Sequence, residues 1–230
     1  MPHLYYITNR QAFPGSESSR QQQLLKKIQE AAAAGVDYIQ LREKDLSARA
    51  LENLARAAIQ IIKAQLETGS PQVKTKLLIN SRTDVALAAG ADGVHLRSDD
   101  ISPEEVRAIQ SAAARNSKLE TRNLIVGISC HSVADVRRAA HEGADFAVLA
   151  PIFGKQIREK DALQIQALGL ETIQTACEDS LPIFALGGIT LENASACLNA
   201  GAKGIAAVRL FQEHNIQETT LQVHRSWKTR

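Results

Sequence analysis

Residues 89–100 read AGADGVHLRSDD, a small-residue helix end and a glycine corner followed by the apolar run Gly93 to Leu96 and a polar end. The pattern recurs three more times, as AGVDYIQLRE at 34–43, EGADFAVLAP at 142–151 and AGAKGIAAVR at 200–209. Successive copies are 55, 53 and 58 residues apart when aligned on Gly35, Gly90, Gly143 and Gly201. These intervals are too long for one strand and helix but suit two. Each copy therefore predicts a second strand in the gap beside it.

Those second strands are short apolar runs that each end in a polar residue or glycine. They are LYYIT at 4–8, LLIN at 77–80, LIVGIS at 124–129 and IFALGG at 183–188. Segments such as 48–66 and 132–142 place apolar residues at helical spacing, so strands and helices alternate. Eight such units predict a closed (β/α)8 barrel, the TIM barrel, as one domain over residues 1–230. An open doubly wound sheet ranks lower, because no GxGxxG follows the first strand.

Composition favours a soluble enzyme of the cytoplasm. Apolar residues make up 44% of the chain, and 27 basic against 25 acidic residues give a net charge of +2. This balance argues against nucleic acid as a partner. No 18-residue apolar run and no signal-like N-terminus occur, so a membrane partner is not expected. Cys130, Cys177 and Cys197 are too scattered for a disulfide framework and are interpreted as small buried apolar residues.

In a (β/α)8 barrel the active site lies at the carboxyl ends of the strands. There Gln40, Arg42 and Lys44 alternate along an extended segment, so their side chains share one face. A guanidinium fork and an ammonium beside it suit a diphosphate. The alternative is an Arg42 and Lys44 pair that is solvated or neutralised by Glu43 and Asp45.

A second anion site is predicted where the seventh and eighth strands end. Gly187 and Gly188 close the seventh strand, and Arg209 follows the eighth, before a short helical segment. Barrels often bind phosphate between these loops, where glycine lets backbone N–H groups approach the oxygens. The alternative is a plain glycine turn. Two anion sites across one barrel mouth indicate two phosphorylated small-molecule substrates.

The acidic pair Asp99 and Asp100 ends the fourth strand, just before Ser102 and Pro103. One interpretation is a cap on the next helix. The other is a Mg²⁺ ligand at Asp100, because magnesium commonly bridges a carboxylate and a diphosphate. The amide oxygen of Asn80, on the neighbouring strand, would complete the magnesium shell.

Histidine at the barrel rim is the candidate for proton transfer. Ser129 and His131 alternate at the end of the fifth strand and so point the same way. A histidine at this rim is a better general acid or base than one elsewhere. His95 lies inside its strand and is interpreted as a satisfied residue of the barrel interior.

The chain resembles the thiamine phosphate synthase and thiazole tautomerase (TenI) superfamily over nearly its whole length. The motifs that carry the resemblance are YITNR at 6–10, QLREK at 40–44, LINSRTDVALAAGADGVHL at 78–96, GISCHS at 127–132, GADFAVLAPIF at 143–153 and ALGGIT at 185–190. The synthase joins a hydroxymethylpyrimidine diphosphate to a thiazole phosphate and expels diphosphate. Its chemistry passes through a pyrimidine carbocation, so the resemblance implies charge stabilisation rather than covalent catalysis.

The resemblance also implies a role for each matching residue. In the family, the residues that match Gln40, Arg42 and Lys44 bind the pyrimidine diphosphate, and those that match Asn80 and Asp100 belong to the diphosphate and Mg²⁺ site. The residue that matches Ser129 lies near the reacting centre, and the pair that matches Gly187 and Gly188 holds the thiazole phosphate. The candidate catalytic residues are Arg42, Lys44, Ser129 and His131. Arg209 and Lys155 extend the phosphate-binding set. Assembly into a homo-oligomer stays open.

The sequence departs from the synthase pattern at three places, so two other functions stay open. Ser81 stands where synthases carry Asp, Arg97 and Ser98 replace Gly-Gln, and GKQIREKD at 154–161 replaces a Thr-rich loop. The related tautomerase moves a proton on the thiazole phosphate without Mg²⁺, and in it His131 would be the acid and base. A third alternative is a barrel that binds a thiazole or thiamine phosphate without turnover. The synthase is favoured, because LREKD resembles it and Arg97, Lys155, Arg158 and Lys160 supply charge for a diphosphate.

Overall fold

The computed structural model describes residues 1–67, 75–116, 123–154, 166–178 and 180–228. Within these ranges the strands are β1 (His3–Ile7), β2 (Tyr38–Leu41), β3 (Lys76–Asn80), β4 (Gly93–Leu96), β5 (Ile125–Cys130), β6 (Phe146–Leu149), β7 (Ile183–Ala185) and β8 (Gly204–Ala207). The helices are a 3-10 turn η1 (Arg10–Ala12), α1 (Glu17–Ala33), α2 (Ala48–Glu67), α3 (Thr83–Ala89), α4 (Pro103–Asn116), α5 (Val133–His141), α6 (Gly169–Ala176), α7 (Leu191–Asn199), α8 (Arg209–Gln212) and α9 (Ile216–Lys228).

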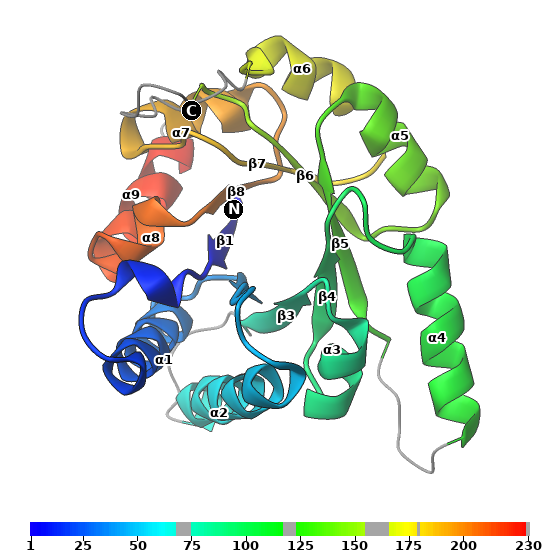
Figure 1. Ribbon diagram of the computed structural model, residues 1–230. Coiled ribbons are helices and arrows are strands. Elements are labelled where there is room, and N and C mark those ends of the chain that lie inside the picture. The colour runs from blue at the N-terminus through cyan, green and yellow to red at the C-terminus, as the bar shows by residue number, and fades with distance from the viewer. Residues whose placement is uncertain (68–74, 117–122, 155–165, 179, 229–230) are drawn as a thin grey trace.

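The eight strands form one closed parallel barrel in chain order, and β1 pairs with both β2 and β8. Figure 1 shows the strands at the centre with helices ranged around them. The predicted (β/α)8 barrel is confirmed, and the open-sheet alternative is wrong. Closure removes every sheet edge, so each strand can satisfy its backbone groups on both sides. The assignment of residues 1–230 to a single domain stays a prediction.

Aromatic rings fill part of the barrel interior. Tyr5, Phe146 and Phe184 are buried and pack against Ile7, Leu78, Val148 and Ala206. The rings of Phe146 and Phe184 stack with their centroids 4.8 Å apart, and Tyr5 meets Phe146 edge-on at 5.6 Å. Alternate strand residues point inward, so a few large side chains close the barrel in layers. The remaining strand positions face outward and form the larger core beneath the helices.

The aspartate of the repeated Gly-Ala-Asp or Gly-Val-Asp sequence holds the strands together at the amino-terminal end of the barrel. Asp37 Oδ2 accepts from the Leu4 N–H at 2.8 Å, and Asp92 Oδ2 accepts from the Leu77 N–H at 3.0 Å. Asp145 Oδ2 likewise accepts from the Val126 N–H at 2.6 Å. In each case the acid before an even strand satisfies a backbone donor of the preceding odd strand. The recurring aspartate is therefore structural and lies away from the carboxyl ends.

Each acid of that set also has a basic neighbour. The pairs are His3–Asp37, Lys76–Asp92 and Arg107–Asp145, at 2.9, 2.9 and 2.7 Å. The fourth copy of the repeat carries Lys203 in place of the aspartate. The sequence repeat thus reflects a repeated contact in three of its four copies.

The predicted element boundaries agree with the structure to within a few residues. The segments 48–66 and 132–142 are α2 and α5, and Ser132 Oγ caps α5 by accepting from the Asp135 N–H at 3.0 Å. The run 183–188 is a strand only as far as Ala185, because Gly187 and Gly188 have φ of 98° and 66°. Such left-handed backbone ends a strand.

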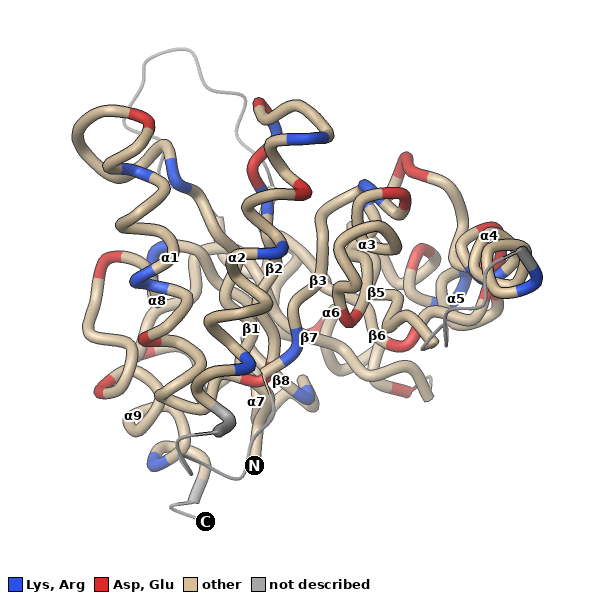
Figure 2. The backbone as a smooth tube through the Cα atoms, turned by 90° about the horizontal axis from the view of Figure 1, so that it is seen from below, with Lys and Arg blue, Asp and Glu red and all other residues tan. Residues whose placement is uncertain are grey.

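Basic and acidic residues are interspersed over the molecule, without a face of one sign, as Figure 2 shows. This distribution agrees with the near-neutral net charge. In the described part of the chain, no helix is both long enough and apolar enough to cross a bilayer.

Candidate active site

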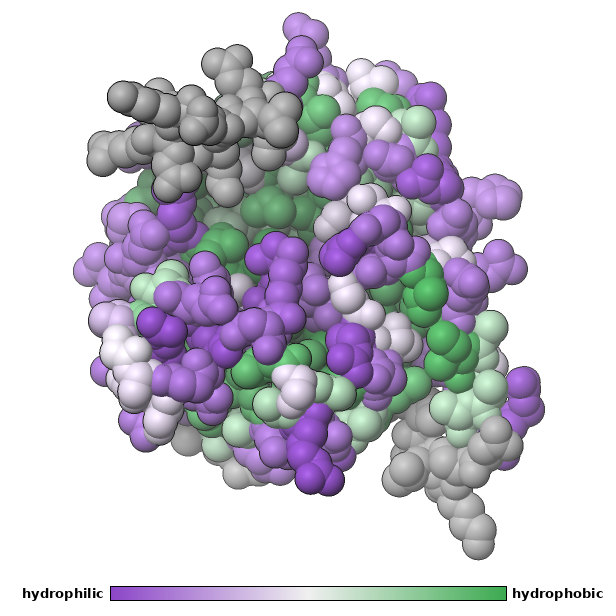
Figure 3. Space-filling view, viewed as in Figure 1, coloured by the Kyte–Doolittle hydropathy of each residue, from purple (hydrophilic) through white to green (hydrophobic). Residues whose placement is uncertain are grey.

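Polar residues gather over the middle of the molecular face in Figure 3, between apolar side chains. The candidate residues extend from the carboxyl ends of the strands, as expected for this fold. Gln40 is the deepest of the strand 2 row, with 2% of its surface exposed. Its Nε2 donates to the Tyr5 hydroxyl oxygen at 3.0 Å, and burial raises the pKa of Tyr5 above its ordinary value. Gln40 is therefore held in a fixed orientation at the floor of the mouth.

Arg42 and Lys44 lie close together above Gln40. The positive charge of Arg42 lowers the pKa of Lys44, and burial and the charge of Arg97 act in the same direction. Neither Arg42 nor Lys44 forms an ion pair with any residue that the structure describes. The alternative in which Glu43 and Asp45 neutralise them is wrong, because both acids bind Arg10. Two unpaired and mutually repelling cations favour binding of an anion.

A cavity of about 180 Å³ opens beside these cations. Its polar lining comes from three consecutive strand ends, and an apolar floor comes from β2 and the segment that leads into α2. The lining residues are Leu41, Glu43, Lys44, Leu46, Leu51, Asn80, Ser81, Arg82 and Arg97. The structure thus brings three of the predicted residues, Lys44, Asn80 and Arg97, to one cavity.

Asn80 and Ser81 form the turn that ends β3. Asn80 Nδ2 donates to Ser81 Oγ at 2.9 Å, which directs the amide hydrogens toward Ser81 and leaves the amide oxygen as an acceptor. Ser81 has a φ of 62°, a left-handed conformation that is uncommon outside glycine, and its N–H donates to the His95 carbonyl at 2.8 Å.

Asp99 and Asp100 shape the turn after β4. Asp99 forms a two-pronged ion pair with Arg97, and Asp100 Oδ2 accepts from the Arg97 N–H at 2.7 Å. Neither acid caps α4. That role belongs to Ser102 and Glu105, whose side chains each accept from the other's backbone N–H, at 3.2 and 2.7 Å. The capping interpretation of the acidic pair is therefore wrong.

The magnesium site has a sparse donor set. No group of three or more His, Cys, Asp or Glu side chains suited to a metal ion occurs among the described residues. Mg²⁺ in proteins commonly takes one or two carboxylates and completes its shell with substrate phosphates and water. Of the two predicted magnesium ligands, Asn80 lines the cavity, and Asp100 Oδ2 accepts from the neighbouring Arg97 N–H.

Ser129 points into the barrel and meets His95. The Ser129 Oγ lies 3.0 Å from His95 Nε2, and burial lowers the pKa of His95 to about 3, with the charge of Arg42 acting in the same direction. His95 Nδ1 is buried without a hydrogen-bond partner among the described residues. The interior position was predicted, but the partly unsatisfied ring and its contact with Ser129 were missed, because only packing reveals them.

His131 lies at the rim rather than beside Ser129. Its ring is exposed, and its Nδ1 is 2.8 Å from the Ala150 carbonyl oxygen, so Nδ1 carries the hydrogen that is donated. In the neutral ring this leaves Nε2 as a free acceptor. Ser129 and His131, predicted to share one face, have different partners: Ser129 meets His95, and His131 meets the Ala150 carbonyl.

Gly187 and Gly188 pass close to the segment after β6. A Cβ on Gly187 would lie 2.7 Å from Pro151 Cα, and one on Gly188 would lie 2.8 Å from Phe153 Cβ. Glycine is therefore required by packing as well as by the left-handed φ. Arg209 is exposed at the start of α8, after the neighbouring strand β8. Lys155, Arg158 and Lys160 lie outside the described residues.

The fold and its cationic mouth define a (β/α)8-barrel enzyme for phosphorylated small molecules. The chain belongs to the thiamine monophosphate synthase family, whose model matches residues 4–211.

Similar proteins carry the same name. A thiamine-phosphate synthase of Methanoculleus marisnigri is 38% identical over 178 residues, which are 77% of this chain and 75% of that protein. One from Roseiflexus castenholzii is 34% identical over 205 residues, 89% of this chain and 78% of that protein. The solved thiamine phosphate pyrophosphorylase of Pyrococcus furiosus superposes with a TM-score of 0.75 at 26% identity, covering 97% of this chain and 94% of that one.

Proposed function

We propose that this protein is a thiamine-phosphate synthase that joins hydroxymethylpyrimidine diphosphate to thiazole phosphate and releases diphosphate. The observation that carries the proposal is the pair of cations Arg42 and Lys44, which have no acidic partner among the described residues. They stand at the carboxyl ends of a barrel whose relatives bear that name.

The cations neutralise the leaving group. As the bond to the pyrimidine methylene breaks, negative charge grows on the departing diphosphate, and Arg42 and Lys44 stabilise it in place, beside Arg97, whose guanidinium is paired with Asp99. The polar side chains of Gln40 and Ser129 lie deeper in the barrel and orient the pyrimidine ring. The protein thus contributes charge and position, in agreement with a site that needs no nucleophile.

The thiazole phosphate is assigned to the loops after β7 and β8. Gly187 and Gly188 bring no side chain of their own to the loop after β7, which packs against Pro151 and Phe153, and Arg209 follows β8. Binding there would place the second substrate across the mouth from the diphosphate. Lys155 belongs to the same proposal as a further phosphate contact.

Magnesium would be held by Asp100 and the amide oxygen of Asn80. When bound, it supplies positive charge to the diphosphate, alongside the cations of the chain. Arg97 stands next to Asp100 at this edge of the cavity, where its guanidinium is paired with Asp99.

The tautomerase is the second candidate because His131 Nε2 is left free by the contact of Nδ1 with the Ala150 carbonyl. One experiment distinguishes the two enzymes. The purified protein is given both synthase substrates with Mg²⁺ and, separately, the thiazole tautomer. Formation of thiamine phosphate is expected. Conversion of the tautomer without any thiamine phosphate would overturn the proposal, and binding without turnover of either would indicate the non-catalytic barrel. A cytoplasmic location and a homo-oligomer stay predictions.

A further inference from the structure

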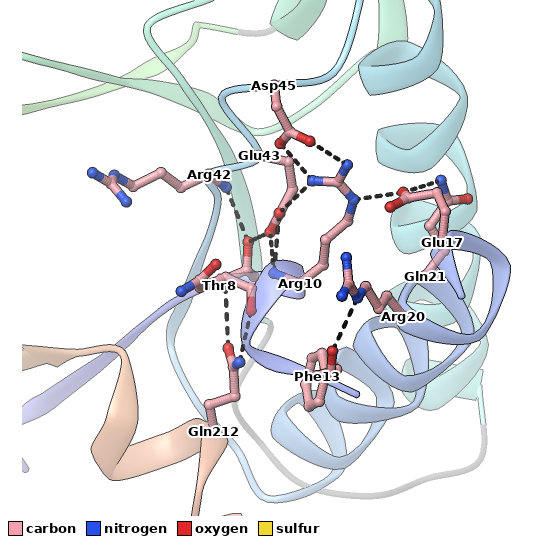
Figure 4. Close-up of polar contacts among 11 residues, drawn as sticks. Thr8, Arg10, Phe13, Glu17, Arg20, Gln21, Arg42, Glu43, Asp45 and Gln212 are labelled. Atoms are coloured by element: carbon pink, nitrogen blue, oxygen red, sulfur yellow. Dashed lines mark hydrogen bonds and ion pairs between the residues drawn. The ribbon is translucent and has the colours of Figure 1, made fainter. Parts of the chain in front are cut away.

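Residues 42–45 alternate in charge as Arg, Glu, Lys and Asp. β2 ends at Leu41, and Lys44 and Asp45 lie in the turn that follows. Figure 4 shows the Arg42 side chain extending away from Arg10, whereas the carboxylates of Glu43 and Asp45 converge on the Arg10 guanidinium. Lys44 lines the cavity with Asn80 and Arg97. Glu43 belongs to the same cavity lining, but its carboxylate and that of Asp45 are paired with Arg10.

Arg10 holds the acids with every nitrogen of its guanidinium. Nη1 and Nη2 donate to the two oxygens of Asp45, each at 2.6 Å, and Nη1 also donates to Glu43 Oε2 at 3.2 Å. Nε donates to Glu17 Oε1 at 2.7 Å. The Arg10 side chain is 3% exposed and that of Glu43 is 1% exposed. Arg10 lowers the pKa of Asp45 far below its usual range, so this acid remains charged.

A chain of hydrogen bonds links Arg10 to the backbone of Arg42. The Arg10 N–H donates to Glu43 Oε2 at 3.0 Å, and Thr8 Oγ1 donates to Glu43 Oε1 at 2.5 Å. Thr8 Oγ1 in turn accepts from the Arg42 N–H at 3.0 Å. The end of β1 thus fixes the backbone from which the cation side chains project.

We infer that Arg10 is a positioning residue, which binds the carboxylates of Glu43 and Asp45 and leaves Arg42 and Lys44 free for a phosphate group. Without the guanidinium, two acids would stand next to two cations in sequence and would pair with them. The substrate anion would then compete with carboxylates of the same loop. This inference rests on the proposed role of Arg42 and Lys44 as diphosphate ligands.

The test uses Arg10→Gln and inorganic diphosphate as the probe, with affinity measured by calorimetry. We expect about tenfold weaker binding, because released acids compete for the cations. Arg107→Gln is the matched control. Arg107 also binds an aspartate and a backbone carbonyl, those of Asp145 and Leu124, but at the opposite end of the barrel. It should lower the melting temperature without changing diphosphate affinity.

A rescue experiment distinguishes the positioning role of Arg10 from a general loss of structure. In the triple variant Arg10→Gln, Glu43→Gln, Asp45→Asn the freed acids are neutral, so diphosphate affinity should return to within about threefold of wild type. Wild-type affinity in Arg10→Gln, or no recovery in the triple variant, would overturn the inference. Should Arg10→Gln fail to fold, Arg10→Lys, which loses the two-pronged contact with Asp45, carries the same test with a smaller expected loss. If Arg42→Ala and Lys44→Ala bind diphosphate normally, the proposed function fails instead.

Discussion

At the scale of single residues, the proposed preference of the site for anions rests on Arg42 and Lys44, which have no acidic partner among the described residues. Each cation has a neighbouring acid in the sequence, yet those acids bind elsewhere. A cation that is neutralised in the free protein would have to break that pair before it bound a substrate. Because Arg10 binds those acids, Arg42 and Lys44 can bind a substrate anion without first breaking an ion pair.

Arg42→Ala and Lys44→Ala should each lower kcat/KM for the pyrimidine diphosphate by roughly 30-fold to 10³-fold, which corresponds to about 2 to 4 kcal/mol of transition-state stabilisation. The melting temperature should change little, because neither residue lies in the core. Arg56→Ala is the control, since Arg56 is an exposed arginine of α2 paired with Glu52. Kinetics like those of this control in both variants would remove Arg42 and Lys44 from the site.

His95 makes stability depend on pH. Its pKa is about 3 in the folded protein and near 6.5 in an unfolded chain. The unfolded state therefore binds the proton more readily, and stability that is fully present above pH 6.5 is lost as the pH falls toward 3, by up to about 1.4 kcal/mol per pH unit.

Urea unfolding of His95→Asn between pH 7 and 5 should accordingly show a flatter dependence than wild type. His131→Asn removes an exposed imidazole and should keep the wild-type slope. Equal slopes for all three proteins would contradict the assignment of the pH dependence to His95.

Ser81 offers a test of the magnesium site. Its left-handed backbone is one that aspartate tolerates better than most residues, so Ser81→Asp should fold. A carboxylate beside Asn80 should tighten Mg²⁺ binding measured by calorimetry in the presence of inorganic diphosphate. Ser81→Asn has the same shape without the charge and is the control. The same magnesium affinity in both variants would mean that no metal site adjoins this turn.

At the scale of elements, the aspartates before β2, β4 and β6 explain why the repeat is visible in the sequence at all. Asp92→Ala leaves the buried N–H of Leu77 without its acceptor and should lower the free energy of unfolding by about 1 to 3 kcal/mol. Urea denaturation measures this loss. Glu52→Ala removes an exposed helical pair and should change stability by no more than about 0.5 kcal/mol. Comparable losses in the two variants would make the aspartate contact unimportant.

The repeated pattern allowed the strands, the closed barrel and the end that carries the site to be predicted from the sequence, because strand period and glycine corners are local properties. The same periodicity predicted one face for Gln40, Arg42 and Lys44, but β2 ends at Leu41 and Lys44 lies in the turn that follows. The partner of Glu43 and Asp45 did not, since Arg10 lies more than 30 residues away along the chain. Nor could the contact of His95 with Ser129, which depends on how the interior packs.

At the scale of the whole molecule, the barrel brings the ends of all its strands to one mouth, so one chain can hold a diphosphate on β2 to β4 and a second phosphate on β7 and β8. The two functions proposed for the mouth differ in which part of it they use. The synthase depends on the diphosphate side with Asp100, and the tautomerase depends on His131. Variants of Asp100 and of His131 therefore distinguish the synthase from the tautomerase.

If the synthase assignment is right, thiamine phosphate formation stops in EDTA and Asp100→Asn loses most of it, while His131→Ala is milder, because the chemistry depends on a neutralised diphosphate more than on a base. Asp100→Asn is a clean probe, since its amide oxygen can still accept from the Arg97 N–H and keep the turn. For a tautomerase the pattern inverts: EDTA and Asp100→Asn are tolerated, and His131→Ala costs about 10² to 10⁴-fold in rate. Steady-state assays of the three proteins with and without EDTA decide between them. Thiamine phosphate formed equally well in EDTA would contradict the magnesium-dependent synthase.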